Sequence, residues 1–180
     1  MIKGKNINLR LVAEKDLEEY HRLYNDIGNR GDYYYMGLEP ESVINRNYHE
    51  TGYWNHDFGR MLIVNKQDIM LGYINYFKSV SYFSSYEIGY RLFKKDAQGK
   101  GIMTEAVGLF IGYLFRAFGI NRLEIRTHPD NRASQKVALK NGFTEEGRAR
   151  GAVLYKDTYI DMLQFSLTRQ DYYSGQKEHK

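Results

Sequence analysis

The sequence contains no cysteine, and that absence excludes disulfide bonds, thiolate metal sites and a cysteine nucleophile. No stretch approaches the ~20 apolar residues of a membrane-spanning helix. Residues 1–10 carry lysine and asparagine where a secretory leader would be apolar. The net charge of +4 is small and its basic residues are scattered, which argues against nucleic-acid binding. We therefore expect a cytoplasmic protein that contacts neither membrane nor nucleic acid.

The remaining composition is that of a globular protein. A chain of 180 residues can bury about two thirds of its unfolded surface in one core. We expect a single domain over residues 1–169 and a polar, flexible tail over residues 170–180. The histidines lack the spacing of metal ligands, so no metal is expected. Seventeen tyrosines exceed what a core requires, because each buried hydroxyl needs a partner, and this excess predicts that some line a cleft.

Hydrophobic periodicity predicts an α+β order of elements. Strands are expected at residues 7–11, 60–65, 69–78, 86–93, 122–127, 144–150 and 155–167, and helices at 16–24, 40–48, 104–118 and 131–141. The helix at 104–118 has apolar residues at every fourth position and is expected to be deeply buried. The strand, glycine turn, helix and strand between residues 86 and 127 form a crossover unit, which predicts two parallel neighbouring strands.

The turn of this crossover unit is a candidate anion site. Gly99 and Gly101 lie between a strand and a helix, where glycine lets the backbone approach a ligand closely. The first turn of the helix adds unpaired N–H groups and the positive end of the helix dipole. A diphosphate would suit such a site, although two glycines can also serve only to close a tight turn.

Spacing separates three phosphate-binding patterns at this turn. The P-loop of nucleotide triphosphatases needs a Gly-Lys-Ser/Thr triplet that is absent here. The dinucleotide fingerprint matches at Gly99 and Gly101, but Thr104 stands where its third glycine or alanine belongs. Glu124, its possible ribose acid, lies inside a predicted strand and not at the end of one. The third possibility is the diphosphate of coenzyme A.

Here the chain resembles the GNAT acetyltransferase superfamily, whose pyrophosphate loop reads Gln or Arg, two residues, Gly, one residue, then Gly or Ala. Gln98 and Gly101 match this pattern, and Met103 stands where a small residue is usual. Further matches to the Rim-type (RimJ/RimL-like) branch of ribosomal-protein N-terminal acetyltransferases are Asn131, Arg132, Ala133, Ser134, Asn141, Gly142, Phe143, Glu146 and Gly147. The resemblance implies a central mixed, mostly antiparallel sheet of about six to seven strands flanked by about four helices.

The resemblance also implies how acetyl-CoA would be bound. Main-chain N–H groups of the turn would hold the diphosphate, with charge added by Lys100. Pantetheine would run along the strand that ends at Leu92 and Phe93, and N–H groups around residues 90–92 would polarise the thioester carbonyl. The residues expected to bind acetyl-CoA are Leu92, Phe93, Gln98, Gly99, Lys100, Gly101, Ile102, Met103, Thr104 and Asn131.

Two residues are the candidates for acid and base. Many family members use a tyrosine as general acid at the position that Ala138 occupies here, so the resemblance to the Rim-type branch points to Ser134 instead. Glu87, on the strand that enters the turn, is the candidate base, with Asp161 or a water chain as alternatives. Simple helix capping would equally account for Ser134 and Asn131, and an ion pair for Glu87.

The acceptor is expected to bind the first third of the chain, where aromatic residues gather. Tyr33, Tyr34, Tyr35, Met36, Tyr48, Glu50, Tyr53 and Trp54 would form an aromatic wall with scattered carboxylates, of which Tyr33, Tyr34, Tyr35 and Trp54 are the expected substrate-binding residues. Ordinary aromatic packing is the alternative interpretation.

These expectations together describe an N-acetyltransferase that acts by direct attack of a primary amine on acetyl-CoA, as a monomer or homodimer. A protein N-terminal α-amine is the first hypothesis for the acceptor. A polyamine or an aminoglycoside is the second. A noncatalytic CoA-binding or interaction module is the alternative of another class.

Overall fold

The computed structural model describes residues 1–33, 37–78 and 80–177. Its contacts divide the chain into two compact units. The first unit is Met1–Phe77 with Gly89–Phe110, and the second is Lys78–Ile88 with Ile111–Lys180. Strand β5 (Ser85–Leu92) and helix α3 (Ile102–Ala117) each contribute residues to both units.

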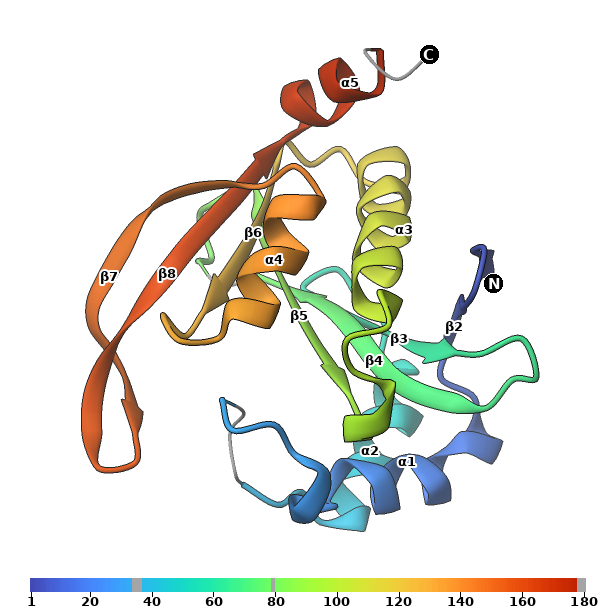
Figure 1. Ribbon diagram of the computed structural model, residues 1–180. Coiled ribbons are helices and arrows are strands. Elements are labelled where there is room, and N and C mark those ends of the chain that lie inside the picture. The colour runs from blue at the N-terminus through green and yellow to red at the C-terminus, as the bar shows by residue number, and fades with distance from the viewer. Residues whose placement is uncertain (34–36, 79, 178–180) are drawn as a thin grey trace. The chain divides into compact units, whose positions relative to one another are not determined.

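The first unit is a sheet whose one face is covered by two helices. Its elements are β1 (Ile2–Lys3), β2 (Asn8–Leu11), α1 (Leu17–Tyr24), α2 (Glu41–Thr51), β3 (Phe58–Val64), β4 (Met70–Phe77), the second half of β5 and the start of α3. The strand order is β1-β2-β3-β4-β5, and the pairs up to β3–β4 are antiparallel. Figure 1 shows α1 and α2 beside these strands. Alternate residues such as Leu62 and Val64 pack with Tyr20, Leu23 and other apolar side chains of the helices.

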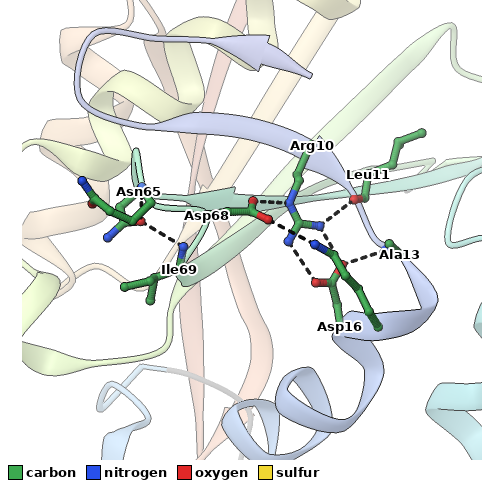
Figure 2. A network of polar contacts seen from close by, with 9 residues as sticks. Arg10, Leu11, Ala13, Asp16, Asn65, Asp68 and Ile69 are labelled. Carbon is green, nitrogen blue, oxygen red and sulfur yellow. Dashed lines mark hydrogen bonds and ion pairs between the residues drawn. The ribbon is translucent and has the colours of Figure 1, made fainter.

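The entrance to α1 is fixed by Arg10 of β2. Figure 2 shows its guanidinium between Asp68, in the β3–β4 turn, and Asp16, immediately before the helix. The Arg10 Nε lies 2.6 Å from Asp68 Oδ1, and its two terminal nitrogens lie 2.6 and 2.9 Å from the Asp16 carboxylate. Asp16 also accepts the Ala13 N–H at 2.8 Å. Because Asp16 is buried, this pairing compensates its charge and sets the direction of α1.

The second unit is built on a long hairpin. Its elements are the first half of β5, the end of α3, β6 (Arg122–Thr127), α4 (Arg132–Lys140), β7 (Thr144–Tyr155), β8 (Thr158–Thr168) and α5 (Arg169–Lys177). The strand order is β5-β6-β8-β7. Strands β5 and β6 are parallel, with Ser85 opposite Arg122, which confirms the predicted crossover unit. Strands β7 and β8 form the hairpin visible in Figure 1.

The α+β class is confirmed, and the structure has one strand and one helix more than the sequence analysis expected. The described residues form eight strands and five α-helices. The additional strand β1 has only two residues, too few for an alternating pattern. Residues 170–177, which the sequence analysis placed in a polar tail, belong to α5. Gly112 leaves room for this helix, since a Cβ there would lie 2.9 Å from the Tyr172 hydroxyl.

Arg169, at the start of α5, caps the end of α3. Its Nη2 donates to the carbonyls of Phe115 at 2.5 Å and Phe118 at 2.7 Å, and its Nε donates to that of Ile120 at 2.9 Å. The last carbonyls of a helix have no intrahelical partner, so these bonds supply one. We expect Arg169→Ala to lower the free energy of unfolding by about 2–4 kcal/mol, measured by urea denaturation.

The matched control for this prediction is Arg150→Ala. Arg150 is exposed on β7, and its loss should change the free energy of unfolding by about 0.5 kcal/mol or less. Equal stability losses in the two variants would contradict the capping role of Arg169.

Candidate functional site

Residues 98–101, here called the glycine loop, join the 3-10 turn Lys95–Ala97 to α3. The loop has a left-handed backbone at Gly99 (φ +73°) and Gly101 (φ +77°), a conformation that glycine adopts without strain. Residues 98–101 are exposed. A Cβ built on either glycine would meet nothing within 4 Å. The main chain of the loop is therefore open to a ligand and is not covered by packed side chains.

The loop leads directly into the first turn of α3. The Glu105 N–H donates to the Gly101 carbonyl at 3.0 Å, so the amides of Ile102 and Met103 precede the first bond of the helix. Amides at this position and the positive end of the helix dipole favour an anion. Lys100, exposed in the loop, adds a positive charge. These features fit the diphosphate that the sequence predicts.

Glu105, the acidic residue of that first turn, binds the segment before β2. Its carboxylate accepts the Asn6 N–H at 2.8 Å and the Asn6 side-chain amide at 2.9 Å. A Cβ on Gly4 would lie 2.4 Å from the same carboxylate, so the segment before β2 passes close by. Glu105 thus ties α3 to this segment.

Phe93, which follows β5, has a buried side chain, so only its main chain is available to a ligand. The Phe93 side chain is 1% exposed and packs against Tyr20 and Tyr73, with ring centroids 5.9 and 5.8 Å apart. Its N–H donates to the Leu71 carbonyl at 2.9 Å. Leu92, the last residue of β5, is half-buried. Any contact of pantetheine with residue 93 would therefore use its carbonyl.

A cavity of about 350 Å³ lies in the first unit and is here called the α1–α2 cavity. Its lining includes Tyr24, Glu39, Glu50, Tyr53, Phe58 and Arg60. Tyr24 ends α1, Glu50 lies on α2 and Arg60 lies on β3. The lining therefore combines aromatic rings with two carboxylates and one guanidinium.

Hydrogen bonds fix the rim of this cavity to the end of α1. The Asn25 side chain donates to the Glu39 carbonyl at 2.8 Å and accepts the Glu39 N–H at 2.9 Å. The Tyr24 carbonyl accepts from Arg30 and from Arg91 of β5, each at 2.9 Å. Cations at the carbonyl end of a helix complement its dipole. The cavity is thereby connected to the strand that leads to the glycine loop.

Arg60 gives one side of the cavity a positive charge. Its guanidinium carbon lies 4.6 Å from the ring centroid of Tyr73 and 5.2 Å from that of Tyr53, within the range of cation–π attraction. Its Nη1 donates to the Tyr20 hydroxyl at 2.5 Å. Burial raises the pKa of Tyr53 to about 12, opposed by Arg60 and assisted by Glu39. Charges of both signs thus act on one hydroxyl in this cavity.

Of the wider aromatic wall expected from the sequence, two residues lie at this cavity, and neither is one of the four expected substrate-binding residues. Glu50 and Tyr53 line it. Trp54 instead packs edge-on against Tyr76, with ring centroids 5.3 Å apart. Tyr33 is 41% exposed. Tyr34, Tyr35 and Met36 lie outside the described residues.

Most of the lining was missed by sequence reasoning, including Tyr24, Glu39 and Arg60. Arg60 left a signal, because it alternates with Phe58 and Leu62 on the face of β3 that packs against the helices. A charged residue at a position where alternation expects an apolar one often marks a site.

Glu87 of β5 lies in the second unit and forms an ion pair with Arg126 of β6. The Arg126 Nη1 lies 2.8 Å from Glu87 Oε2, and its Nη2 lies 3.1 Å from Glu124 Oε2. Only 13% of the Glu87 side chain is exposed. Burial raises the pKa of Glu87, Arg126 lowers it and Glu124 raises it, with a net rise. Such a carboxyl accepts protons at higher pH than an ordinary glutamate.

Ser134 and Asn131 meet at the start of α4. The Asn131 Oδ1 accepts the Ser134 N–H at 3.1 Å, so Asn131 is the N-cap of the helix. Ser134 is half-buried in the first turn. Ala138, at the position of the family's tyrosine, is fully buried, and its carbonyl accepts the Phe143 N–H at 3.2 Å.

Within residues 1–33, 37–78 and 80–177, no three acidic or histidine side chains are grouped as metal ligands would be. None of the helices in these ranges is long and apolar enough to cross a bilayer.

Comparison with known proteins supplies an independent view of the chain. Residues 6–144 match the family described as Acetyltransferase (GNAT) domain. The chain is 29% identical over 180 residues to the probable N-acetyltransferase YjcK of Bacillus subtilis, covering 95% of this chain and 98% of that protein. It is 32% identical over 114 residues to the ribosomal-protein-serine acetyltransferase of Escherichia coli, covering 63% and 60% respectively.

A solved structure shows the same fold. The spermidine N-acetyltransferase from Vibrio cholerae, in complex with CoA and spermine, matches with a TM-score of 0.81 at 17% identity. The match covers 94% of this chain and 99% of that one.

Proposed function

Because this chain belongs to the GNAT acetyltransferase family, we propose that it transfers the acetyl group of acetyl-CoA to the α-amine at a protein N-terminus. Membership of the family makes it an acetyl-CoA-dependent acyltransferase of the GNAT fold. The α-amine as acceptor is our proposal. The observation that carries it is the mixed charge of the α1–α2 cavity.

The donor would be held mainly by main-chain atoms. The amides of Gly101, Ile102 and Met103 would donate to the diphosphate, and Lys100 would add charge. The main chain that ends β5 would pair with pantetheine, and N–H groups at residues 90–92 would polarise the thioester carbonyl. Asn131 would contact pantetheine through its side-chain amide, since its oxygen caps α4. The open backbone of the glycine loop supports this binding mode.

The proposed chemistry is one direct transfer with Glu87 as base and Ser134 as acid. Glu87, directly or through a water molecule, removes a proton from the acceptor ammonium, whose nitrogen then attacks the thioester carbon. A C–N bond forms and the C–S bond breaks. The Ser134 hydroxyl gives its proton to the leaving sulfur and regains one, directly or through water, from the nitrogen that has been acylated. The raised pKa of Glu87 supports its role, because a base must be able to hold the proton that it accepts.

The charges of the α1–α2 cavity favour a peptide over a polyamine. A peptide N-terminus has one ammonium, suited to Glu39 or Glu50, followed by carbonyl oxygens that accept from a guanidinium such as Arg60. A polyamine has several positive charges and no acceptor oxygen, so Arg60 would repel it. Polyamines remain the second candidate because both carboxylates line the same cavity.

Arg60→Gln is expected to lower the preference for peptide over polyamine by about tenfold, since it removes the repulsion and the hydrogen-bond donor together. The measurement is kcat/KM from thiol release, with a peptide that begins with serine and with spermidine as acceptors. Arg46→Gln, an exposed change on α2, is the matched control and should leave the ratio unchanged.

Two outcomes of this acceptor assay would contradict the proposal. A wild-type preference for spermidine that Arg60→Gln does not alter would favour the polyamine hypothesis. Acetyl-CoA that raises the melting temperature while no amine in a broad panel releases thiol would favour a noncatalytic binding module.

A further inference from the structure

The Arg126 guanidinium binds two carboxylates, those of Glu87 and Glu124. Glu87 and Glu124 are directly opposite each other on the parallel strands β5 and β6. Arg126 donates to Glu87 Oε2 at 2.8 Å and to Glu124 Oε2 at 3.1 Å. Two buried carboxylates therefore share one cation.

Resting on the proposed function, we propose that Glu124 is a positioning residue, which keeps Glu87 ready to accept the acceptor's proton by sharing Arg126 with it. Glu124 would touch neither substrate nor donor in this role. It would act only through Arg126 and through its own negative charge.

The two carboxylates differ in how completely they are bound. Glu124 is held on both oxygens, since Arg122 Nε donates to its Oε1 at 2.9 Å and Arg126 holds its Oε2. Glu87 is held on Oε2, and within the described part of the chain its Oε1 accepts no hydrogen bond. Glu87 is therefore the carboxyl of the pair that has an oxygen left for a proton.

The neighbouring charged groups are few and are otherwise engaged. Arg122 pairs with Glu146 of β7 as well as with Glu124. Arg91, the next charged residue of β5, donates to the Tyr24 carbonyl. On β8, the residues opposite Arg126 and Glu124 are Gln164 and Ser166, which carry no charge. Glu124 is therefore the negative charge that acts on Glu87 within this network.

The basicity of Glu87 depends on whether Arg126 binds it alone or also binds Glu124. One guanidinium that served Glu87 alone would stabilise its ionised form and weaken it as a base. Because Arg126 also binds Glu124, and because the negative charge of Glu124 lies close to Glu87, the ionised form of Glu87 is stabilised less. Burial of Glu87 acts in the same direction, and the net result is a raised pKa.

The test is the dependence of kcat/KM on pH in variants that change this balance in opposite directions. Glu124→Gln removes the competing charge and should move the acidic limb of the profile down by about one pH unit. Arg122→Gln leaves Glu124 dependent on Arg126 and should move the limb up. Glu145→Gln, which removes an exposed carboxylate of β7 that is outside this network, is the matched control and should leave the limb in place.

A ¹³C NMR titration of the Glu87 carboxyl in the same variants follows the proton without catalysis. Shifts of opposite sign in Glu124→Gln and Arg122→Gln, seen in both measurements, support the inference. If Glu124→Gln does not fold, Arg122→Gln alone still decides it. An acidic limb that is abolished in Glu87→Gln yet unmoved by Glu124→Gln overturns the inference and leaves Glu87 as the base. An acidic limb that persists in Glu87→Gln overturns both the inference about Glu124 and the role of Glu87 as base.

Discussion

Glu87→Gln is expected to lower kcat by about 10²–10⁴-fold, the usual contribution of a general base. Glutamine has the shape of glutamate but cannot take a proton from the acceptor ammonium. The affinity for acetyl-CoA should not change, because Glu87 is not among the donor-binding residues. The measurements are single-turnover thiol release for kcat and calorimetry for CoA binding.

Asp161→Asn is the control for this loss of rate. Asp161 of β8 was the alternative carboxylate in the sequence, and it accepts the Gly151 N–H at 2.9 Å within the hairpin. Its neutralisation should leave kcat within about twofold of wild type. A full rate in Glu87→Gln together with a large loss in Asp161→Asn would transfer the role of base to Asp161.

Ser134→Ala distinguishes the acid from the base. Loss of the acid should lower kcat and leave the acidic limb of its pH profile in place, whereas Glu87→Gln should remove that limb. Retention of the wild-type rate in Ser134→Ala would remove the acid assignment and leave Ser134 as a residue of the first turn of α4.

Gly101→Val is expected to weaken CoA binding by about 10–100-fold, measured by calorimetry. The backbone at Gly101 has φ +77°, a conformation that a β-branched residue adopts only with strain. The loop would relax to another conformation and its amides would turn away from the diphosphate. Loss of one hydrogen bond to a charged group, worth about 1.5–3 kcal/mol, accounts for an effect of this size.

Gly52→Val is the matched control for Gly101→Val. Gly52, at the end of α2, also has a left-handed backbone, with φ +61°, and a Cβ there would meet nothing within 4 Å. The two variants should lose similar stability, and only Gly101→Val should lose CoA affinity. Equal affinities for CoA in the two variants would contradict a binding role for the glycine loop.

Local patterns were sufficient to predict most of the fold. Strand β6 was predicted at its observed bounds, 122–127, because Leu123 and Ile125 alternate with polar residues and His128 to Asp130 end the run. The apolar period of α3 and the glycines before it were likewise visible in the sequence. Helix α5 was missed because its support comes from Arg169 and Gly112, which act through residues far along the chain.

In the candidate site, too, the features that depend on local sequence could be predicted and those that depend on tertiary structure could not. The conformation of the glycine loop was predictable, because it depends on Gly99 and Gly101, which are two residues apart in the sequence. The α1–α2 cavity was not, because Glu39 and Arg60 come together only through the pairing of helices and strands. The same holds for Glu87 and Glu124, which are far apart in sequence and become neighbours through the register of β5 and β6.

The open backbone of the glycine loop has a consequence for how binding and turnover respond to acidity. Main-chain amides neither gain nor lose protons across the physiological range, so the protein's share of the attraction for a diphosphate is constant there. Turnover through Glu87, the proposed base, falls instead as acid protonates that carboxyl, whose pKa is raised by burial. A cell that acidifies would therefore slow this protein while it remains saturated with donor.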